Sequence, residues 1–388
     1  MKKIIIVNNN MKVGGVQKSL YNLLWEIHDQ YDVTLLLFKK TGVYAERLPK
    51  NVKVLECRSL FRLLGVSQGE CAGTDKLTRG ALALIAKLFG RPAAMKIVLA
   101  SQKLLPEDYD CAISFLHNGN IKNFYGGVQE FVLHKIKAGK KVAFLHCDYG
   151  NCGANHPANN GLIARFDAVA ACSDGCRRAF EELQPEMKSR SNTVQNCHRI
   201  EEIRALAEAD PLVYAPGAVH IVMVSRLTHE KGIERAIRAV AYAVESGIAV
   251  KLHIVGGGPM EEMLRTVAVE HGIADDVRFY GEQGNPYRYM KNADLFLLTS
   301  FHEAAPMVIE EARCLGLPVL TVRTTSSTEM VTEPGCGWVC DNDQRALDEM
   351  LLACISDRQL LVETRKRICN CCMDNTKAKK QFTELVEG

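Results

Sequence analysis

Long apolar runs are missing from this chain of 388 residues. No stretch approaches the roughly 18 consecutive apolar residues that a membrane-spanning helix needs. The apolar run from Ile4 to Val7 is too short for the core of a signal peptide, and three asparagines follow it. We therefore expect a buried first strand at this point and a cytoplasmic location for the protein.

A strong net charge is missing as well. The chain carries 48 Lys and Arg residues against 45 Asp and Glu residues, which gives a formal net charge of +3. This excess is too small to indicate a nucleic-acid partner. A composition of 47% hydrophobic and 24% charged residues is typical of a soluble globular protein, and the length suits two domains of about 190 residues each.

Tight cysteine pairs of the kind that hold structural zinc are also missing, although the chain has 15 cysteines. An odd number of cysteines in a large chain without an export signal does not indicate a disulfide framework. We expect reduced thiols that serve as small core or surface residues, and no metal site. The loosely spaced groups are Cys147/Cys152, Cys172/Cys176, Cys336/Cys340 and the cluster Cys369, Cys371, Cys372.

Short apolar runs separated by helical patterns fill the first half of the chain. The runs are continuous rather than alternating, which is typical of parallel strands covered on both faces. Helical patterns such as Val16–His28 and Gly175–Leu183 lie between them. This wiring predicts a doubly wound open parallel sheet. The predicted strands are 3–7, 33–38, 52–55, 111–115, 142–145 and 168–171.

A second series of the same kind follows a polar break at 209–217, which contains two prolines and a glycine and reads as a linker. We therefore predict an α/β protein with two Rossmann-like domains, residues 1–205 and 206–365. Such sheets bind ligands outside the carboxyl ends of their strands, so two facing sheets would form a cleft. The predicted strands are 220–224, 251–255, 277–280, 295–298 and 318–322.

The segment 74–103 is unusually basic, with six Lys or Arg residues and one acid, Asp75. An apolar stripe through Leu82, Ile85, Leu88 and Leu99 accompanies them. Two interpretations stay open: a solvated helix packed on the core, or peripheral contact with an anionic membrane surface. The basic residues are Lys76, Arg79, Lys87, Arg91, Lys96 and Lys103.

The stretch Ser300–Val319 holds the first candidate binding residues. Pro306 marks the start of a helix, and Gly316 marks its end. The free N–H groups at such a start suit a phosphate. Glu303 and Glu311 would lie about 10–12 Å apart along the axis at ~1.5 Å per residue, where they could accept hydrogen bonds from hydroxyls at the two ends of a diphosphate ligand. The alternative is a pair of structural glutamates.

Two cations and two glycines complete the pattern. Arg226 and Lys231 lie in the loop after the predicted strand 220–224, where they could clamp a diphosphate. Gly14 and Gly15 follow the first strand and would let a ligand approach the backbone. There is no Gly-x-Gly-x-x-Gly sequence, which disfavours a nicotinamide-dependent dehydrogenase. An ordinary charged loop and a tight turn remain the alternatives.

In this order, these segments resemble the retaining glycosyltransferases of the GT-B fold, glycosyltransferase family four or glycosyl transferases group one. The resemblance runs along essentially the whole chain. It implies that residues 1–205 form an acceptor-binding domain, that residues 206–365 form a nucleotide-sugar-binding domain, and that a C-terminal helix, residues 366–388, packs back on the first domain. The matching motifs are Gly14-Gly15, Ser225-Arg226-Leu with Glu230-Lys231-Gly232, Ile254-Val-Gly-Gly-Gly-Pro259 and the pair Glu303 and Glu311.

The resemblance implies a role for each candidate. Arg226 and Lys231 would hold the donor diphosphate and stabilise the leaving nucleotide. Glu303 would hold the donor sugar and Glu311 the ribose hydroxyls, while His146 would lie near the transferred sugar. The remaining donor-binding candidates are Gly14, Gly15, Gly257, Ala304, Ala305, Pro306, Met307 and Val308.

The resemblance further implies transfer of a hexose from a nucleotide-sugar, a UDP-sugar before a GDP-sugar, to a glycan or lipid-linked acceptor in cell-surface polysaccharide synthesis. It implies no cofactor and no metal, although Asp108-x-Asp110 and Asp341-x-Asp343 have the form of a metal-binding motif. A catalytically inactive partner that binds a nucleotide-sugar and a sugar-nucleotide epimerase of the same fold are the alternatives.

Overall fold

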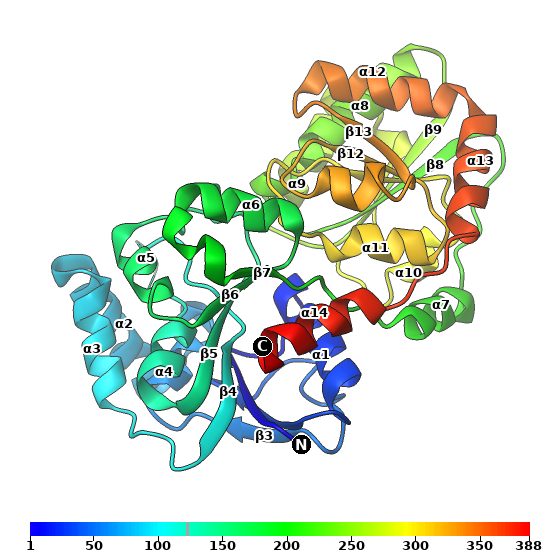
Figure 1. Ribbon diagram of the computed structural model, residues 1–388. Helices are drawn as coiled ribbons and strands as arrows, with labels where there is room; N and C mark the ends of the chain where they lie inside the picture. The colour runs from blue at the N-terminus through cyan, green and yellow to red at the C-terminus, as the bar shows by residue number, and fades with distance from the viewer. Residues whose placement is uncertain (122–123) are drawn as a thin grey trace. The chain divides into compact units, whose positions relative to one another are not determined.

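Two parallel sheets organise the computed structural model, which describes residues 1–121 and 124–388 (Figure 1). The chain divides into two compact units. The first contains residues 1–197 and 375–388, and the second contains residues 198–374. The sequence patterns had placed these boundaries at 205/206 and 365/366.

The first unit is built on a seven-stranded sheet in the order β3-β2-β1-β4-β5-β6-β7, with all pairs parallel. Alternate side chains of β1 enter two different apolar cores: Ile4 and Ile6 join one, and Ile5 and Val7 join the other. Burial on both faces is the reason for the continuous apolar run. The strands are β1 (Lys3–Asn8), β2 (Asp32–Leu37), β3 (Lys53–Glu56), β4 (Asp108–Ser114), β5 (Lys137–Leu145), β6 (Ala168–Ala171) and β7 (Ser191–Thr193).

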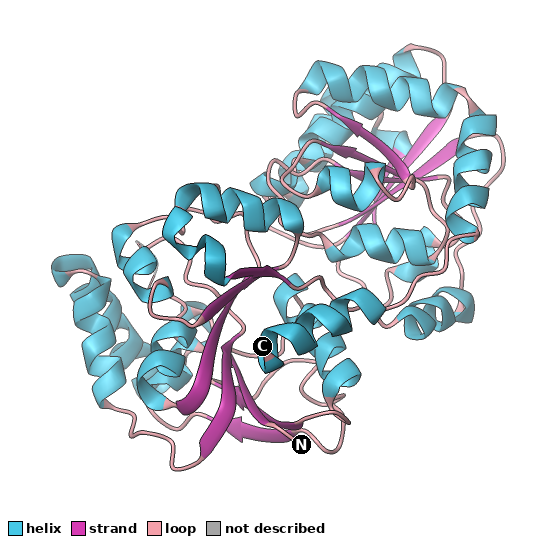
Figure 2. Cartoon of the chain, in the orientation of Figure 1, coloured by secondary structure: helices cyan, strands magenta, loops and turns pink. Residues whose placement is uncertain are grey.

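Helices cover this sheet, as the cyan and magenta elements of Figure 2 show. The α-helices are α1 (Gly15–Ile27), α2 (Gly73–Phe89), α3 (Arg91–Ala100), α4 (Val128–Lys135), α5 (Pro157–Ile163), α6 (Asp174–Leu183) and α14 (Thr376–Glu387). The short 3₁₀ helices are η1 (Leu60–Leu64), η2 (Gln68–Glu70) and η3 (Pro185–Arg190).

The second unit repeats this design with six parallel strands in the order β10-β9-β8-β11-β12-β13. Within β8, Ile221 and Met223 enter one apolar core and Val222 enters the other. The strands are β8 (Val219–Val224), β9 (Val250–Val255), β10 (Val277–Phe279), β11 (Leu295–Leu298), β12 (Val319–Val322) and β13 (Gly337–Cys340).

Along the chain, α7 precedes the strands of the second unit, and the other helices lie between these strands or follow them. The α-helices are α7 (Ile200–Ala209), α8 (Ile233–Glu245), α9 (Glu261–Glu270), α10 (Tyr287–Met290), α11 (Met307–Cys314), α12 (Gln344–Ser356) and α13 (Arg358–Cys369). The shorter turns are η4 (His229–Lys231), η5 (Ala274–Asp276) and the π-helical η6 (Thr328–Thr332).

Both sheets share one strand order. Numbered within each unit, the first six strands run 3-2-1-4-5-6, which is the Rossmann order. The chain reverses its direction of growth between β1 and β4 in the first unit, and between β8 and β11 in the second. The loops after these strands flank a crevice position where such sheets bind their ligands. The predicted fold class of two Rossmann-like parallel sheets is therefore confirmed.

The segment predicted as a linker, 209–217, is attached to the second unit. Leu212 donates its N–H to Arg288 O at 2.9 Å, and the Tyr214 hydroxyl donates to Tyr289 O at 2.6 Å. Ahead of it, α7 buries Ile203 and Ala207 in an apolar core of that unit. These contacts explain why the boundary falls before α7, at 197/198.

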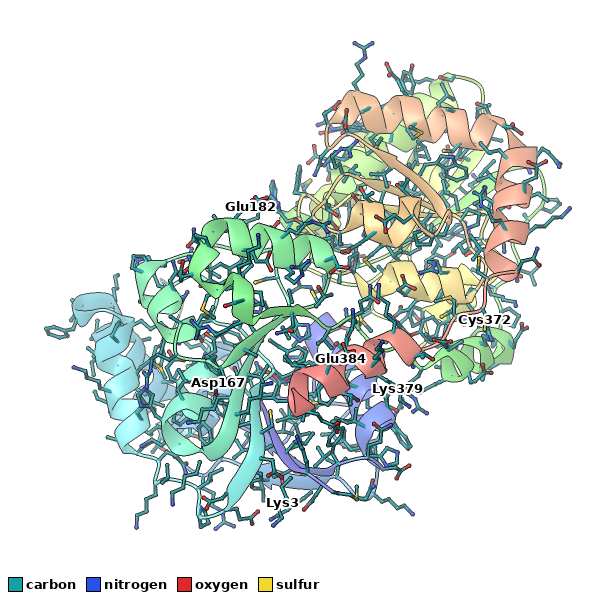
Figure 3. The ribbon with its side chains drawn as sticks, viewed as in Figure 1. Lys3, Asp167, Glu182, Cys372, Lys379 and Glu384 are labelled. Atoms are coloured by element: carbon teal, nitrogen blue, oxygen red, sulfur yellow. The ribbon has the colours of Figure 1, made fainter. Side chains whose placement is uncertain are left out.

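The last helix, α14, returns to the first unit as the resemblance implies. Phe382 is fully buried in the core of that unit and packs edge-on against Tyr31, with ring centroids 6.0 Å apart. On the same helix Lys379, labelled in Figure 3 beside Glu384, pairs with Glu26 of α1 at 3.3 Å.

The basic segment is not one helix but two. Gly90, with a φ of +83°, separates α2 from α3, which lie side by side (Figure 1). Two of its six basic residues do not lie on the surface. Arg79 is buried and donates to Leu63 O and Val66 O, and Arg91 is buried against Glu130. Among the helices that the structure describes, none is long and apolar enough to cross a bilayer.

Replacing Phe382 with Ala tests the anchorage of α14. The chain has two tryptophans, Trp25 in the first unit and Trp338 in the second, so a Trp338→Phe background leaves Trp25 as the reporter of the first unit. Because a buried phenylalanine is lost, we expect the free energy of unfolding followed by Trp25 fluorescence to fall by about 3–5 kcal/mol. Lys380→Ala, on an exposed position of the same helix, is the control. An unchanged urea midpoint in Phe382→Ala would contradict this anchorage.

Candidate functional site

An ion pair joins the loops after the two central strands of the second sheet. The Lys231 ammonium donates to Glu303 Oε1 at 2.7 Å, and both side chains are largely buried, with 19% and 10% exposed. Lys231 follows β8 and Glu303 follows β11, so the pair lies at the reversal of strand order. The structure therefore brings together two residues that the sequence had proposed independently.

Backbone contacts hold these loops in register. Gly232 has a φ of +60°, and a Cβ at this position would lie 2.3 Å from Thr299 O. The Thr299 hydroxyl donates to Gly232 O at 2.9 Å, and Phe301 donates its N–H to Glu230 O at 3.0 Å. Only a glycine permits this approach. The hydrogen bond by which Thr299 joins the two loops was not predicted, since a single threonine after a strand gives no sequence signal.

Arg226 has a more open position than Lys231. Its side chain is 73% exposed, and its guanidinium lies 3.4 Å from Glu230 Oε1. An exposed pair of this kind contributes little to stability. The Arg226 side chain is therefore available for an anionic ligand.

Three buried serine hydroxyls lie at the same edge of the sheet. Ser225 follows β8, Ser300 follows β11 and Ser326 follows β12, and these strands are neighbours. None of the three Oγ atoms has a hydrogen-bond partner within the described residues. A buried hydroxyl without a partner is costly and calls for a water or a ligand. Ser225 belongs to one of the matching motifs, but no role was predicted for any of these serines, since a single serine is uninformative without the strand order.

The helix α11 begins as predicted. Pro306 is its N-cap, Met307 is its first residue, and no side chain caps its free N–H groups. Gly316, with a φ of +68°, follows its end. Because residues 303–306 are not helical, the helical rise used to separate Glu303 from Glu311 applies only from Met307 onward.

Two neighbouring glutamates on α11 have different environments. Glu310 contacts Arg313 through both carboxylate oxygens at 2.6 Å. Burial raises the pKa of Glu310, and the charge of Arg313 opposes this effect. Glu311, the residue proposed for the ribose, is buried with 2% of its surface exposed. The structure places Ala304, Ala305 and Val308 at partly exposed positions around the start of the helix.

The turn after β9 contains three glycines, Gly256 to Gly258, and the packing of the fold does not require the middle one, Gly257. A Cβ at Gly256 or Gly258 would lie within 2.4 Å of a backbone oxygen, of Ser225 and Leu227 respectively. At Gly257 the nearest atom would be 3.7 Å away. Leu227 donates its N–H to Gly257 O at 2.9 Å, which ties this turn to the loop that carries Arg226.

In the first unit, Gly14 and Gly15 begin α1. A Cβ at Gly15 would meet nothing within 4 Å, and at Gly14 it would meet only the side chain of Gln17. No side chain caps the helix, and its first turn contains no acidic residue. The packing of the fold therefore does not explain Gly15, which leaves open space at an uncapped helix end.

His146 follows β5 and packs against two aromatic rings. Its ring centroid lies 4.5 Å from that of Phe115 and 5.7 Å from that of Phe144. Burial lowers the pKa of His146 to about 3, and the nearby His117 adds to the shift. The imidazole is therefore neutral at pH 7, and its buried Nε2 has no hydrogen-bond partner among the described residues.

Aspartates of both Asp-x-Asp motifs form hydrogen bonds or ion pairs within the fold. Asp110 accepts a hydrogen bond from the N–H of Lys3 at 2.7 Å, and Asp341 pairs with Arg323 at 3.0 Å. Asp343 caps α12 through the N–H of Ala346. All 15 cysteines are free thiols. One group of potential metal ligands does occur among the described residues, formed by His117, Cys147 and Cys152.

The fold defines a class. Over its whole length the chain matches HepE of Anabaena, solved in complex with UDP and glucose, with a TM-score of 0.68 and 18% identity over 100% of both chains. It matches the lipopolysaccharide glycosyltransferase WaaG with a TM-score of 0.64 and 16% identity over 99% of this chain and 100% of the other. The chain thus has the fold of the GT-B glycosyltransferases.

The sequence match is confined to part of the chain. Residues 214–370 match the family model of the glycosyl transferases group 1. WcaL of Escherichia coli K12, assigned as a glycosyltransferase to colanic acid biosynthesis, is 35% identical over 36% of this chain and 37% of its own length. The amylovoran biosynthesis glycosyltransferase AmsK of Erwinia amylovora is 32% identical over 34% and 35%. The matched part spans little more than a third of these curated relatives.

Substitution of the glycine turn tests the packing of this loop. In a Trp25→Phe background, which leaves Trp338 as the reporter of the second unit, we expect Gly258→Ala to lower the free energy of unfolding by about 1–3 kcal/mol. The added methyl group would press on the backbone of Leu227. Gly257→Ala is the matched control, with an expected change of about 0.5 kcal/mol or less. Equal losses in both variants would show that the turn packs differently.

Proposed function

We propose that this protein is a glycosyltransferase that moves a hexose from a nucleotide-sugar donor to a glycan or lipid-linked acceptor, with retention of the anomeric configuration. The observation that carries the proposal is the Lys231–Glu303 pair at the strand-order reversal of the second sheet. The match of residues 214–370 to the glycosyl transferases group 1 supports it.

The chemistry of the pair suits a sugar diphosphate. An ammonium has three donors and a carboxylate has about four acceptor positions, so one mutual hydrogen bond leaves both groups with capacity for a ligand. Lys231 would donate to phosphate oxygens, and Glu303 would accept from sugar hydroxyls. The unpartnered hydroxyls of Ser225 and Ser300 at the same edge would gain partners in such a complex.

Departure of the nucleotide places new negative charge on the diphosphate. Lys231 and the exposed Arg226 would stabilise this charge, together with the uncapped start of α11 at Pro306 and Met307. Glu311 would hold the ribose. Because these groups act as fixed electrostatic partners, the proposed transfer needs neither a cofactor nor a metal.

The remaining roles follow from the resemblance and the named relatives. HepE was solved with UDP and glucose, and TarM of S. aureus with UDP, which favours a UDP-sugar over a GDP-sugar as donor. WaaG and AmsK are named for lipopolysaccharide and amylovoran synthesis, which favours a cell-surface glycan as product. In the first unit, Gly14, Gly15 and the neutral His146 are the candidates for contact with the transferred sugar or the acceptor.

A nucleotide-sugar-binding partner without catalytic activity, or an epimerase of this fold, would use the same donor site. Arg226 and Lys231 would bind the donor diphosphate whether the protein is a transferase, an epimerase or an inactive binding partner. The fate of the sugar separates them: transfer or hydrolysis for a transferase, an isomerised nucleotide-sugar for an epimerase, and neither for a binding partner.

A screen of UDP-, GDP- and ADP-sugars for nucleotide release tests the proposal. We expect turnover with one donor, and a loss of about 10²–10³-fold in kcat for Lys231→Ala and Arg226→Ala, since each removes a stabilising charge. Glu311→Ala should weaken donor binding. Arg345→Ala, which removes an equal charge from an 86% exposed side chain on α12, should leave turnover unchanged.

The outcomes discriminate among the alternatives. Tight binding of a nucleotide-sugar with no release and no isomer, in the presence of candidate acceptors, would replace the transferase by the inactive partner. An isomerised donor would establish the epimerase. If no nucleotide-sugar binds to the folded protein, the proposed donor site is wrong.

The surface of α2 and α3 supports a further part of the proposal, peripheral contact with an anionic bilayer. Four apolar side chains on α2 are exposed, namely Leu77, Leu84, Leu88 and Phe89. Lys76, Lys87 and Lys96 are exposed on the same helix pair. The single acid of the segment, Asp75, pairs with Arg62. Exposed apolar groups beside unopposed lysines are the composition of a helix that binds a lipid surface.

Sedimentation with phosphatidylglycerol-containing vesicles tests this contact. We expect the wild type to sediment with anionic vesicles and to remain in solution with phosphatidylcholine alone, because each lysine near an anionic surface contributes about 1 kcal/mol. Changing Lys76, Lys87 and Lys96 to Gln should abolish sedimentation. The control variant changes three exposed lysines elsewhere in the first unit, Lys50, Lys188 and Lys377. Equal sedimentation of both triple variants would remove the membrane contact from the proposal.

A further inference from the structure

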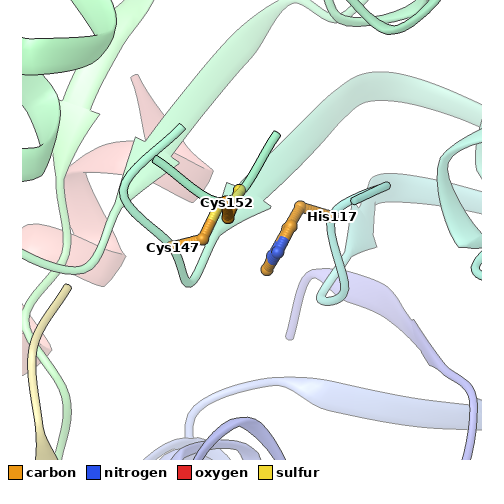
Figure 4. A group of neighbouring side chains, drawn as sticks. All are labelled: His117, Cys147 and Cys152. Atoms are coloured by element: carbon orange, nitrogen blue, oxygen red, sulfur yellow. The ribbon is translucent and has the colours of Figure 1, made fainter. Parts of the chain in front are cut away.

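Three side chains with nitrogen and sulfur donors meet in the first unit. His117 follows β4, Cys147 follows β5, and Cys152 lies in the turn beyond it. Their ligand atoms all lie within 4.8 Å of one another. Figure 4 shows the two cysteine side chains next to each other, with the imidazole ring of His117 beside them.

The fold explains how these residues converge. The strands β4 and β5 are parallel neighbours, so the residues after their carboxyl ends emerge at the same edge of the sheet. A tight turn then brings Cys152 back toward Cys147: Cys152 donates its N–H to Asp148 O at 3.0 Å, and Asn151 donates its N–H to Asp148 Oδ1 at 3.1 Å. Gly153, with a φ of +73°, completes the turn.

The donor set selects a class of metal. One imidazole and two sulfurs form a set that Zn²⁺ accepts from proteins, while Mg²⁺ and Ca²⁺ prefer oxygen ligands. Tetrahedral zinc with Zn–S bonds of about 2.3 Å holds its ligand atoms roughly 3.8 Å apart. Ligand atoms that already lie within 4.8 Å need to contract by only about 1 Å to reach this geometry.

The buried Nδ1 atom of His117 has no competing hydrogen bond in the part of the chain that the structure describes. Within the described residues, Nδ1 of His117 is buried and has no hydrogen-bond partner. A buried polar atom without a partner is costly, and a bound metal, or a water beside it, removes this cost. Both sulfurs are free thiols rather than a disulfide.

We propose that His117, Cys147 and Cys152 bind one Zn²⁺ ion, with a fourth coordination position open to water. The ion joins the loop after β4 to the loop after β5, and so fixes the segment that follows His146. This site lies in the first unit, whereas Lys231, Glu303 and Arg226 lie in the second. Loss of metal binding and loss of donor binding are therefore measured separately.

The test is direct metal titration of the folded, reduced, full-length protein after treatment with a chelator. We expect one equivalent of Co²⁺ to bind with a thiolate-to-cobalt charge-transfer band, and Zn²⁺ to displace it. Cys152→Ser and His117→Ala should each weaken binding at least tenfold and reduce the band, while His117→Cys should retain one equivalent and strengthen the band. In the Trp338→Phe background, Zn²⁺ should also raise the unfolding midpoint reported by Trp25, because it binds the folded form more tightly than the unfolded chain.

The exposed cysteines near the C-terminus supply the control. Cys371 and Cys372 lie in a cluster of thiols that could bind cobalt adventitiously, so the double variant Cys371→Ser/Cys372→Ser should leave the stoichiometry at one. The proposal is overturned if the wild type binds no cobalt, or if the band survives Cys152→Ser and disappears in the double variant. It is equally overturned if Cys147 and Cys152 form a disulfide in protein kept under reductant. Because Cys152 is exposed, its serine variant is expected to fold even where a Cys147 variant does not.

Discussion

Parallel pairing of strands is the constraint on which the rest of this protein depends. Backbone hydrogen bonds between β8 and β11 place the carboxyl ends of both strands at one edge, and only for this reason do Lys231 and Glu303 meet across 72 residues of chain. The loops can approach because Gly232 has no side chain to collide with Thr299 O. The order of the strands therefore brings both the ion pair and the three serine hydroxyls to one edge of the sheet.

The ion pair itself is costly to maintain in the absence of a ligand. Two largely buried charges lose hydration, and their mutual attraction returns little net stability. A diphosphate and a sugar would bring charge and hydroxyl groups to the same place. This cost supports the proposed binding of a ligand at the pair, whereas Glu310 and Arg313 satisfy each other within α11.

The first sheet uses the same strand order to assemble different chemistry. At the ends of β4 and β5 the side chains are His117, His146 and Cys147 rather than a cation and a carboxylate. Burial, with a smaller contribution from His117, lowers the pKa of His146 and keeps its imidazole neutral. The two units therefore share an architecture and differ in the donor atoms that they present at their sheet edges, which is why soft metal chemistry is inferred for one and anion binding for the other.

The sequence by itself determined the two-sheet fold and half of the candidate site. Burial on both faces leaves continuous apolar runs such as Ile4–Val7, and local chemistry marks the start of α11 at Pro306 and its end at Gly316. The strands β7 and β13 escaped prediction because the three residues of β7 are all polar and β13 is a run of only four residues that begins with a glycine. The tertiary structure alone decided that Arg79 and Arg91 point inward, that 209–217 belongs to the second unit, and that His117 meets two cysteines. A local sequence pattern indicates whether a segment is buried or exposed. Contacts between distant residues depend on the order of the strands, and this order is set by pairing between segments that no single segment encodes.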